Sequence, residues 1–501
     1  MPTDFNLRRG LHPKRWEAVT PNGNAGNAGG SLIISPDLTS VWQEALCLAS
    51  LTLRSRDTGG WTPLPSFGSV VNNSGSEGTW HPNGPTGTVS AASPNSITTN
   101  LTPLRRLDGI TVRLTGGTGA GQERVVVSNT MGANSVLTVD QPWTIQPDAT
   151  TTWLLRSGRY YVIGPATLGS VFKYFDPVLW SWSSALASPS GRADSFGSAM
   201  AATCFTPLLV NQSVTSATGT TLTTVGKNWA VNQWRNQQVR ITSGKGAGQI
   251  RIITGNTATD LTVAAWVVTP DSSSKYTIEG AEDYLYEVGN ASTTTRRYSL
   301  SANTWTTLAA RSVVADSGVT LTHIDRDPSA LWSDETNFIN GRYLYSIRGI
   351  DGAGSTAIDK YDITSDVWSP VVYSPVGTLF GWGDAAHYVN GILYIQGMGI
   401  NSGATIPWYK LRPSAGSLEP WTTLTGPTFL GKSGPRSYVT SRVGTDGRTY
   451  YYFYQSSVVA GATASSEYRI QEIPLCPKHT ISATGCIFPH SRTWPRLYLL
   501  L

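Results

Sequence analysis

The sequence predicts an all-β protein, and three observations lead to that prediction. Glycine, serine, threonine, asparagine and aromatic residues are abundant, whereas long runs of alanine, glutamate, lysine and leucine at helical spacing are missing. A pattern of apolar strand, tyrosine strand and tryptophan recurs along the chain. A second pattern occurs twice and interrupts the first. Internal repeats of this kind determine the architecture of a chain.

The tryptophan repeat has four clear copies. In each, an apolar strand ends at or beside a glycine, a tyrosine-containing strand follows, and a tryptophan comes several residues after that tyrosine. The copies are residues 160–164 with Tyr174 and Trp182, residues 284–289 with Tyr298 and Trp305, residues 343–349 with Tyr361 and Trp368, and residues 393–397 with Tyr409 and Trp421. Partial copies end at Trp61 and cover residues 450–470, which makes about six units.

Tryptophan spacing predicts a β-propeller. Trp305 and Trp368 are 63 residues apart, and Trp368 and Trp421 are 53 apart, near the period of a four-stranded blade. The intervals that end at Trp182 and at Trp305 are about twice as long, and each contains one copy of the second pattern. A small twisted sheet needs a neighbour on both faces, so we expect large aromatics to fill the wedge between blades. The expected inter-blade residues are Trp61, Trp182, Trp305, Trp368 and Trp421.

The tryptophan repeat resembles the Kelch family of β-propellers. Its blades carry a glycine pair after the second strand, a tyrosine on the third and a tryptophan before the fourth, and residues 358–368 are the copy most similar to this pattern. No blade of this chain keeps both glycines, since the positions read Gly164-Pro165, Gly289-Asn290, Arg348-Gly349 and Gly397-Met398. The resemblance therefore implies an about six-bladed Kelch-like β-propeller with two inserted small β domains and extended termini, and no Kelch-type partner.

The second pattern is a duplicated module. Residues 119–124 read Gly-Ala-Gly-Gln-Glu-Arg and residues 246–251 read Gly-Ala-Gly-Gln-Ile-Arg, each between stretches with alternating apolar positions. Downstream, Trp143 corresponds to Trp266, and Pro147-Asp148 corresponds to Pro270-Asp271. Glycines between alternating strands are typical of hairpins, so residues 238–241 and 250–253 should pair around the glycine-rich turn. Lys245 does not make this turn a phosphate loop, because a strand follows it and the first copy has Thr118 there.

The duplicated module resembles Gly-x-Gly-Ala-Gly-Gln repeats of structural and fibre proteins of tailed bacteriophages. In that family the module is a β scaffold or adhesion element, and no catalytic residues are assigned to it. The expected organisation is an N-terminal arm (1–30), a first blade (31–75), a first module (76–157), a second blade (158–210), a second module (211–280), the remaining blades (281–475) and a C-terminal tail (476–501).

The charge distribution argues against a dedicated nucleic-acid binder. The net charge is only +5 with 14% charged residues, without a concentrated basic stripe. The N-terminal basic cluster is expected to dock on an acidic neighbour, with nucleic-acid contact as the alternative. Its assembly candidates are Arg8, Arg9, Lys14, Arg15 and Trp16. We expect no secretory signal and no membrane span.

Two cysteines and two histidines gather near the C-terminus. Cys476, His479, Cys486 and His490 could bind zinc through thiolate and imidazole groups, although the central spacing is short. A disulfide between Cys476 and Cys486 or packing without a ligand are the alternatives. We expect no other cofactor.

No catalytic set emerges from the acidic residues. Asp325, Asp327, Asp334, Glu335, Asp351, Asp359 and Asp384 lie in the predicted blades, but their spacing selects no pair for glycoside hydrolysis. Together with this absence, the resemblance of the duplicated module to phage proteins implies a non-enzymatic structural component of a phage virion (neck, collar, tail or capsid surface). We expect it to assemble in the host bacterial cytoplasm with other virion subunits, as a symmetric homo-oligomer. A host-receptor or glycan-binding fibre protein is the alternative, and a polysaccharide-degrading propeller enzyme is a weaker one.

Overall fold

The computed structural model describes most of residues 77–314 and the strands on either side. The described ranges are 16–19, 32–34, 44–47, 52–55, 61–68, 77–314 with gaps at 121, 165–168, 193–198, 204–206, 281–283 and 290–291, then 321–324, 343–348, 358–371 and the strands from β31 to β37. Within these ranges the protein is all-β, and all strand pairs are antiparallel. No helix of the described part is long and apolar enough to cross a membrane.

Among the described strands, six of the eight sheets contain four strands each. The first contains β2 (Leu32–Ile34), β3 (Glu44–Cys47), β4 (Thr52–Ser55) and β5 (Trp61–Pro63). The second contains β6 (Glu77–His81), β13 (Arg159–Ile163), β14 (Phe172–Asp176) and β15 (Ser181–Trp182). The third contains β16 (Ala199–Ala202), β24 (Tyr284–Val288), β25 (Thr295–Ser299) and β26 (Thr304–Leu308).

The other three follow later in the chain. The fourth contains β27 (Thr322–Ile324), β28 (Tyr343–Ile347), β29 (Ile358–Asp362) and β30 (Val367–Val371). The fifth contains β31 (Ala385–Val389), β32 (Ile392–Gln396), β33 (Trp408–Arg412) and β34 (Ser417–Thr422). The sixth contains β35 (Arg436–Val443), β36 (Thr449–Val458), β37 (Ser465–Pro474) and β1 (Trp16–Val19).

One edge strand of each four-stranded sheet contacts edge strands of two other four-stranded sheets. β2 contacts β6 and β35, β6 contacts β16, and β16 contacts β27. β27 in turn contacts β31, and β31 contacts β35. The series of contacts therefore returns to the strand at which it began.

The sixth sheet joins the two ends of the chain. β1 pairs antiparallel with β37, so that Trp16 lies opposite Ile470 and Val19 opposite Glu467. Trp16 was expected in an assembly arm, whereas the structure places it at the start of a strand of this sheet. Strand pairing uses backbone groups, which explains why the basic pattern around Trp16 did not reveal it.

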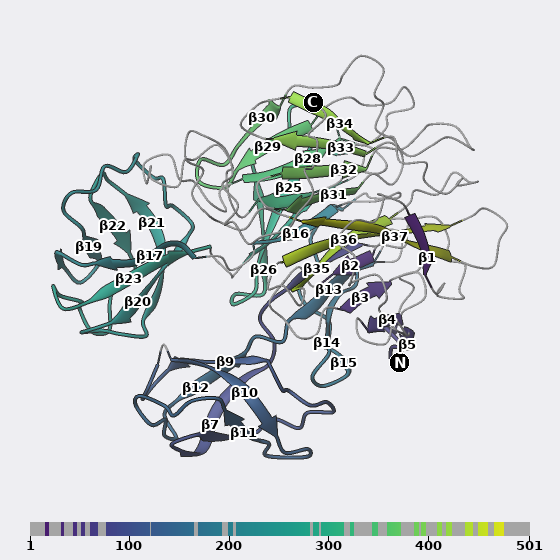
Figure 1. Cartoon of the computed structure of the whole chain (residues 1–501). Helices are drawn as coiled ribbons and strands as arrows, with labels where there is room; N and C mark the ends of the chain where they lie inside the picture. Colours follow the sequence, from purple (N-terminus) through teal and green to yellow (C-terminus); the bar gives the residue numbers. More distant parts are fainter. Residues whose placement is uncertain are drawn as a thin grey trace, which may run out of the picture.

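The two inserted modules lie outside the group of four-stranded sheets (Figure 1). The first is a closed barrel of β7 (Thr86–Ser93), β8 (Ser96–Thr99), β9 (Thr111–Gly116), β10 (Glu123–Asn129), β11 (Val136–Val139) and β12 (Thr152–Leu155). The second is one sheet of β17 (Pro207–Ser213), β18 (Ser216–Ala217), β19 (Thr221–Thr223), β20 (Gln238–Ser243), β21 (Ile250–Asn256), β22 (Asp260–Val263) and β23 (Lys275–Glu279).

Strand order agrees between the two modules. Neighbouring strands in the first module follow the order β9-β10-β11-β8-β7, and the corresponding strands in the second follow the order β20-β21-β22-β19-β18. In the first module the long strand β7 pairs with both β8 and β12. In the second module two strands replace the single strand β7: β18 pairs with β19, and β17 pairs with β23. The pairing of β17 with β23 contains shifts in register, and Asn211 within β17 has a φ of 57°. The second sheet is therefore open where the first one closes.

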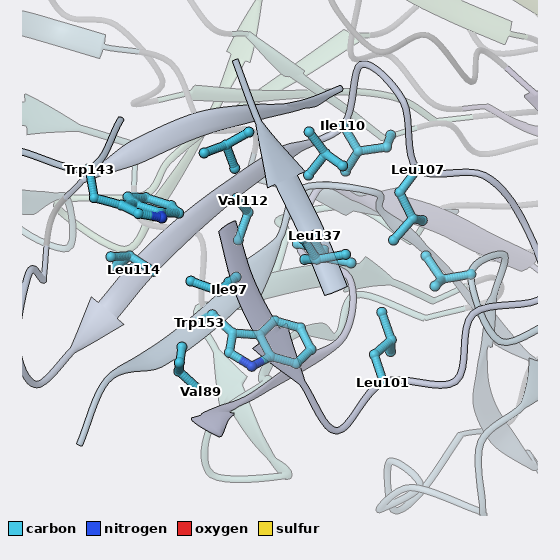
Figure 2. Packing of buried hydrophobic residues seen from close by; sticks show 14 residues of the cluster. Val89, Ile97, Leu101, Leu107, Ile110, Val112, Leu114, Leu137, Trp143 and Trp153 are labelled. Carbon is cyan, nitrogen blue, oxygen red and sulfur yellow. The ribbon is translucent and has the colours of Figure 1, made fainter. Parts of the chain in front are cut away.

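Each module has its own apolar core. In the first, Val112, Leu114, Leu137, Trp143 and Trp153 are buried together, and Figure 2 shows their side chains in one interior. The corresponding residues of the second module are also buried in one cluster: Val239, Ile241, Leu261, Trp266 and Tyr276. Because apolar residues occupy corresponding positions in the two modules, the strands of both modules pack in the same order.

Strand pairings also show where the modules begin. The first module was expected over residues 76–157, but β6 within that range pairs with β13 of the second four-stranded sheet. The barrel itself starts at Thr86. The second module was expected over residues 211–280, and its first strand starts at Pro207.

Candidate functional site: the clamped loops of the two inserted modules

The repeated glycines allow a tight turn between two paired strands. As predicted, β9 pairs with β10 and β20 pairs with β21 around the glycine-rich segment. Gly117 and Gly244 have φ values of 70° and 75°, in the left-handed region that favours glycine. A Cβ on Gly117 would lie 2.1 Å from Thr150 O, and a Cβ on Gly244 would lie 2.1 Å from Ser273 O. Glycine is required there for both backbone angle and space.

The repeated glutamine fastens a distant loop to this turn. Gln122 Nε2 donates to Gly119 O at 2.9 Å and to Ile145 O at 2.7 Å. Its Oε1 accepts from the backbone N–H groups of Thr144 and Ile145. Gln249 makes the same four bonds to Gly246, Val267 and Val268. Since a glutamine side chain has two N–H donors and an oxygen with two lone pairs, the amide is saturated in both copies.

The repeated arginine fastens the start of the same loop. Arg124 Nε donates to Pro142 O at 3.1 Å, and its guanidinium carbon lies 5.5 Å from the Trp143 ring centroid. Arg251 Nε donates to Ala265 O at 2.9 Å and lies equally far from the Trp266 ring. Hydrogen bond and ring contact together hold the buried indole in place.

The repeated aspartate fixes the end of the loop. Asp148 accepts from the backbone and hydroxyl groups of Thr150 and from the Thr118 hydroxyl. Asp271 accepts from the backbone and hydroxyl groups of Ser273. The Thr150 hydroxyl bond is the largest cause that lowers the pKa of Asp148, and the Ser273 hydroxyl bond does the same for the pKa of Asp271.

The clamped loops expose apolar side chains. We call residues 143–148 and 266–271 the clamped loops. Ile145 in the first is 58% exposed, and Val267 in the second is 85% exposed. Because the polar side chains of the repeat are used within the module, the loops present an apolar surface on a stiff support rather than a ligand pocket.

An ion cluster joins the two modules. Arg113 and Arg240 occupy equivalent positions on β9 and β20. The buried carboxylate of Glu279 accepts from Arg240 Nε at 2.7 Å and lies 3.6 Å from Arg113 Nη2 of the other module. Glu123 lies 3.4 Å from Arg113 Nε and 4.0 Å from Arg240 Nη1. We call Arg113, Glu123, Arg240 and Glu279 the inter-module cluster.

Three of the predicted inter-blade tryptophans have described side chains, and each donates to a group that belongs to or follows the strands of the preceding four-stranded sheet. Trp182 Nε1 donates to Pro65 O at 2.9 Å, and Trp305 Nε1 donates to Ala187 O at 2.8 Å. Trp368 Nε1 donates to Thr295 Oγ1 of β25 at 2.8 Å. Trp61 and Trp421 lie in β5 and β34, and their side chains are outside the described part. The inter-blade role of the whole set stays a prediction.

The remaining predicted site residues lie mostly outside the described part. This holds for Arg8, Arg9, Lys14, Arg15, Cys476, His479, Cys486 and His490. Within the described ranges, no three His, Cys, Asp or Glu side chains gather in a way that could hold a metal ion. Of the acids considered for hydrolysis, Asp359 is described, and it accepts two bonds from Arg348 at 2.6 and 2.7 Å.

Sequence reasoning missed a buried charge network between the four-stranded sheets. Arg192 Nε donates to Glu287 Oε1 at 3.0 Å, and Arg192 Nη2 donates to Glu77 Oε1 at 3.1 Å. Arg296 Nη1 donates to Glu287 Oε2 at 2.8 Å. The available signal was Glu287, a charged residue in the otherwise apolar strand Tyr284–Val288. A charge in a buried strand needs a partner, so it points to an arginine nearby.

Comparisons with known proteins assign no family. No protein-family profile and no curated protein matches the chain. A mutant of AofleA from Arthrobotrys oligospora has 10% identity and a TM-score of 0.32, over 93% of this chain and 92% of that chain. An auxiliary nutrient binding protein from Bacteroides thetaiotaomicron has 12% identity and a TM-score of 0.23, over 78% of this chain and 84% of that one. A proposed 6-phosphogluconolactonase from Bacteroides fragilis has 11% identity and a TM-score of 0.24, over 81% and 96%.

Proposed function

We propose that this chain is a non-enzymatic structural component of a tailed-bacteriophage virion. In this proposal the six four-stranded sheets form a six-bladed Kelch-like propeller that serves as a platform. The two inserted modules project from it and contact other virion subunits through their clamped loops. The assignment to a phage virion depends on the resemblance of the duplicated motif to repeats of phage structural proteins.

Contacts between edge strands support the propeller. Each of β2, β6, β16, β27, β31 and β35 contacts two others, as the innermost strands of a ring would. Trp182, Trp305 and Trp368 donate to groups that belong to or follow the strands of the preceding sheet. β1 and β37 share one sheet, which ties the ends of the chain together.

The observation that carries the scaffold role is the duplicated clamp. Gln122 and Gln249 each use all four hydrogen-bonding positions inside their own module. The side chains of these two glutamines therefore hold the clamped loops in shape and leave no hydrogen-bonding group for a ligand. What the loops offer to a partner is the apolar surface of Ile145, Val267 and Val268.

The direct test uses purified phage particles from a phage that carries this gene. Mass spectrometry and cryo-electron microscopy should find the chain in a fixed copy number per particle, at a symmetric position, in contact with other subunits. Its presence only in the unassembled fraction of the lysate contradicts the proposal.

A matched pair of variants tests the clamped loops. Ile145→Asp combined with Val267→Asp should reduce incorporation into particles, because a charge replaces the apolar contact. Met131→Asp combined with Val231→Asp is the control, since Met131 and Val231 are also exposed but lie outside the clamped loops. Equal incorporation of both pairs would show that the loops make no assembly contact.

The same exposed loops favour attachment to a host surface as a second candidate. In that case the isolated protein should bind whole host cells or a host glycan array. Binding should be lost in the Ile145→Asp and Val267→Asp variant while assembly is retained.

A further inference from the structure

Arg192 and Arg311 occupy equivalent places at two successive junctions between four-stranded sheets. Arg192 follows β15 and precedes β16, and Arg311 follows β26 and precedes β27. Arg192 Nη1 donates to Gly164 O at 2.5 Å, and Arg311 Nη2 donates to Gly289 O at 3.0 Å. These glycines directly follow the equivalent strands β13 and β24.

At the first junction the buried charges balance. Arg192 and Arg296 face the carboxylates of Glu77 and Glu287, with nitrogen to oxygen distances between 2.8 and 3.1 Å. All four side chains are less than a tenth exposed. Such pairing is what makes buried guanidinium and carboxylate groups tolerable.

At the second junction both carboxylates are missing from the equivalent positions. Glu77 lies opposite Ile163 on β13, whereas the residue opposite the corresponding Val288 on β24 is Ala199. Glu287 lies opposite Arg296, whereas the corresponding Ser346 lies opposite Asp359. Arg311 therefore meets a hydroxyl, with Nη1 to Ser346 Oγ at 3.5 Å, where Arg192 meets a carboxylate.

Asp359 does not restore the balance. Both of its oxygens accept from Arg348, at 2.7 and 2.6 Å. Arg311 is 3% exposed, and its Nε has no hydrogen-bond partner among the described residues. The Trp368 ring centroid lies 5.8 Å from its guanidinium carbon and compensates only part of a buried charge. Across the two junctions four guanidinium groups thus face three carboxylates.

The electrostatics of Arg311 agree with this count. Burial, the largest influence, and the positive charge of Arg348 lower the pKa of Arg311, whereas Asp359 and Glu287 raise it. The net result is a pKa of about 10. A buried guanidinium of this kind is stabilised by an additional negative charge.

We propose that a small monovalent inorganic anion, with chloride as the probe, binds beside Arg311. The anion accepts from Arg311 Nε. It supplies the negative charge that Glu77 and Glu287 supply at the first junction. A buried place between packed sheets favours a small ion.

The first experiment measures thermal unfolding of the full-length protein against chloride concentration. Gluconate, a much larger monovalent anion than chloride, keeps the ionic strength constant. Chloride should raise the melting temperature in a saturable manner. An increase of free chloride from one to one hundred times its dissociation constant raises the ratio of folded to unfolded protein about 50-fold. Identical melting temperatures in chloride and gluconate overturn the proposal.

Two exchange variants connect the effect to this place. Ser346→Glu puts a carboxylate where the first junction has Glu287, so it should raise the melting temperature without chloride and abolish the chloride dependence. Ala199→Glu, at the position of Glu77, is the second choice if Ser346→Glu does not fold. Glu287→Ser is the matched opposite change and should introduce a second chloride-dependent component.

A bromide soak of crystals of the unaltered protein needs no variant. An anomalous peak within about 3.5 Å of Arg311 Nε supports the site. A peak-free map, or a water at this position that bromide does not replace, overturns it. Chloride dependence that persists in both glutamate variants shows that the anion binds elsewhere and also overturns it.

Discussion

Alanine at Gly117 should destabilise the first module much more than alanine at Gly132. Both glycines have positive φ, 70° and 92°, so both substitutions place an L-residue in the left-handed region. That conformation costs about 1–2 kcal/mol. A Cβ at Gly132 meets nothing within 4 Å, whereas a Cβ at Gly117 would lie 2.1 Å from Thr150 O and 2.8 Å from Thr151 N.

The difference between the two variants isolates the steric effect. The backbone at Thr150 must move to accept the new methyl group, and overpacking of this kind costs about 1–3 kcal/mol more. We therefore expect about 1–2 kcal/mol for Gly132→Ala and about 2–5 kcal/mol for Gly117→Ala. The movement also disturbs the Asp148 turn, since Thr150 donates two bonds to Asp148.

Hydrogen exchange on the full-length protein measures this difference locally. Amides of β9, β10 and the loop at residues 143–148 report opening of the module, and a difference of 2 kcal/mol corresponds to about 30-fold faster exchange. Gly244→Ala and Gly226→Ala repeat the comparison in the second module, where Gly244 faces Ser273 O at 2.1 Å and Gly226 faces open space. Equal exchange in the two members of both pairs would refute the steric reasoning.

Three further predictions concern the clamp, the acid range and the inter-module cluster. Gln249→Ala removes four partly exposed hydrogen bonds and should cost about 1–3 kcal/mol, seen as faster exchange at Val267 and Val268 but not at Ile145, which Gln122 holds. The pKa values of Asp148 and Asp271 are lowered in the folded protein, so their stabilising effect is complete above about pH 4 and is lost as the pH falls through the folded-state values. An acid titration of exchange at residues 266–271 should show this loss in the unaltered protein and a smaller loss in Asp271→Asn, where only Asp260 of this module keeps a lowered pKa. Glu279→Gln leaves Arg240 and Arg113 without the buried carboxylate, so it should cost about 3–5 kcal/mol and speed exchange in β9 as well as in β20. Lys245→Met, which alters an exposed pair with Asp271, should leave β9 unchanged.

The pattern of residues predicted the parts of the fold that depend on periodicity and turn chemistry. Alternating apolar positions on either side of the glycine-rich turn predicted the pairing of β20 with β21, and the register has Gln238 opposite Ile252. The same apolar positions fill both module cores, which explains why two copies of different composition share a strand order.

The clamp could be located from the sequence but not explained by it. Gln122 and Gln249 recur at a fixed distance from the glycines, yet their partners lie about 20 residues later, in loops whose backbone groups have no sequence signature. Arg192 shows the same limitation. Its carboxylate partners Glu77 and Glu287 come from opposite sides of the chain, 115 and 95 positions away, and only folding brings them together.

The pairing of β1 with β37 has a consequence for biosynthesis. Trp16 lies opposite Ile470, so this strand pair forms only after about 450 further residues have left the ribosome. At 5–20 residues per second that interval lasts roughly 20–90 s. The strand pairings within the barrel of β7–β12 and within the sheet of β17–β23 involve only residues of each module, so both sets of strands can pair while synthesis continues. During the wait, the backbone groups of β1 are open to a wrong partner strand, including the same segment of another nascent chain.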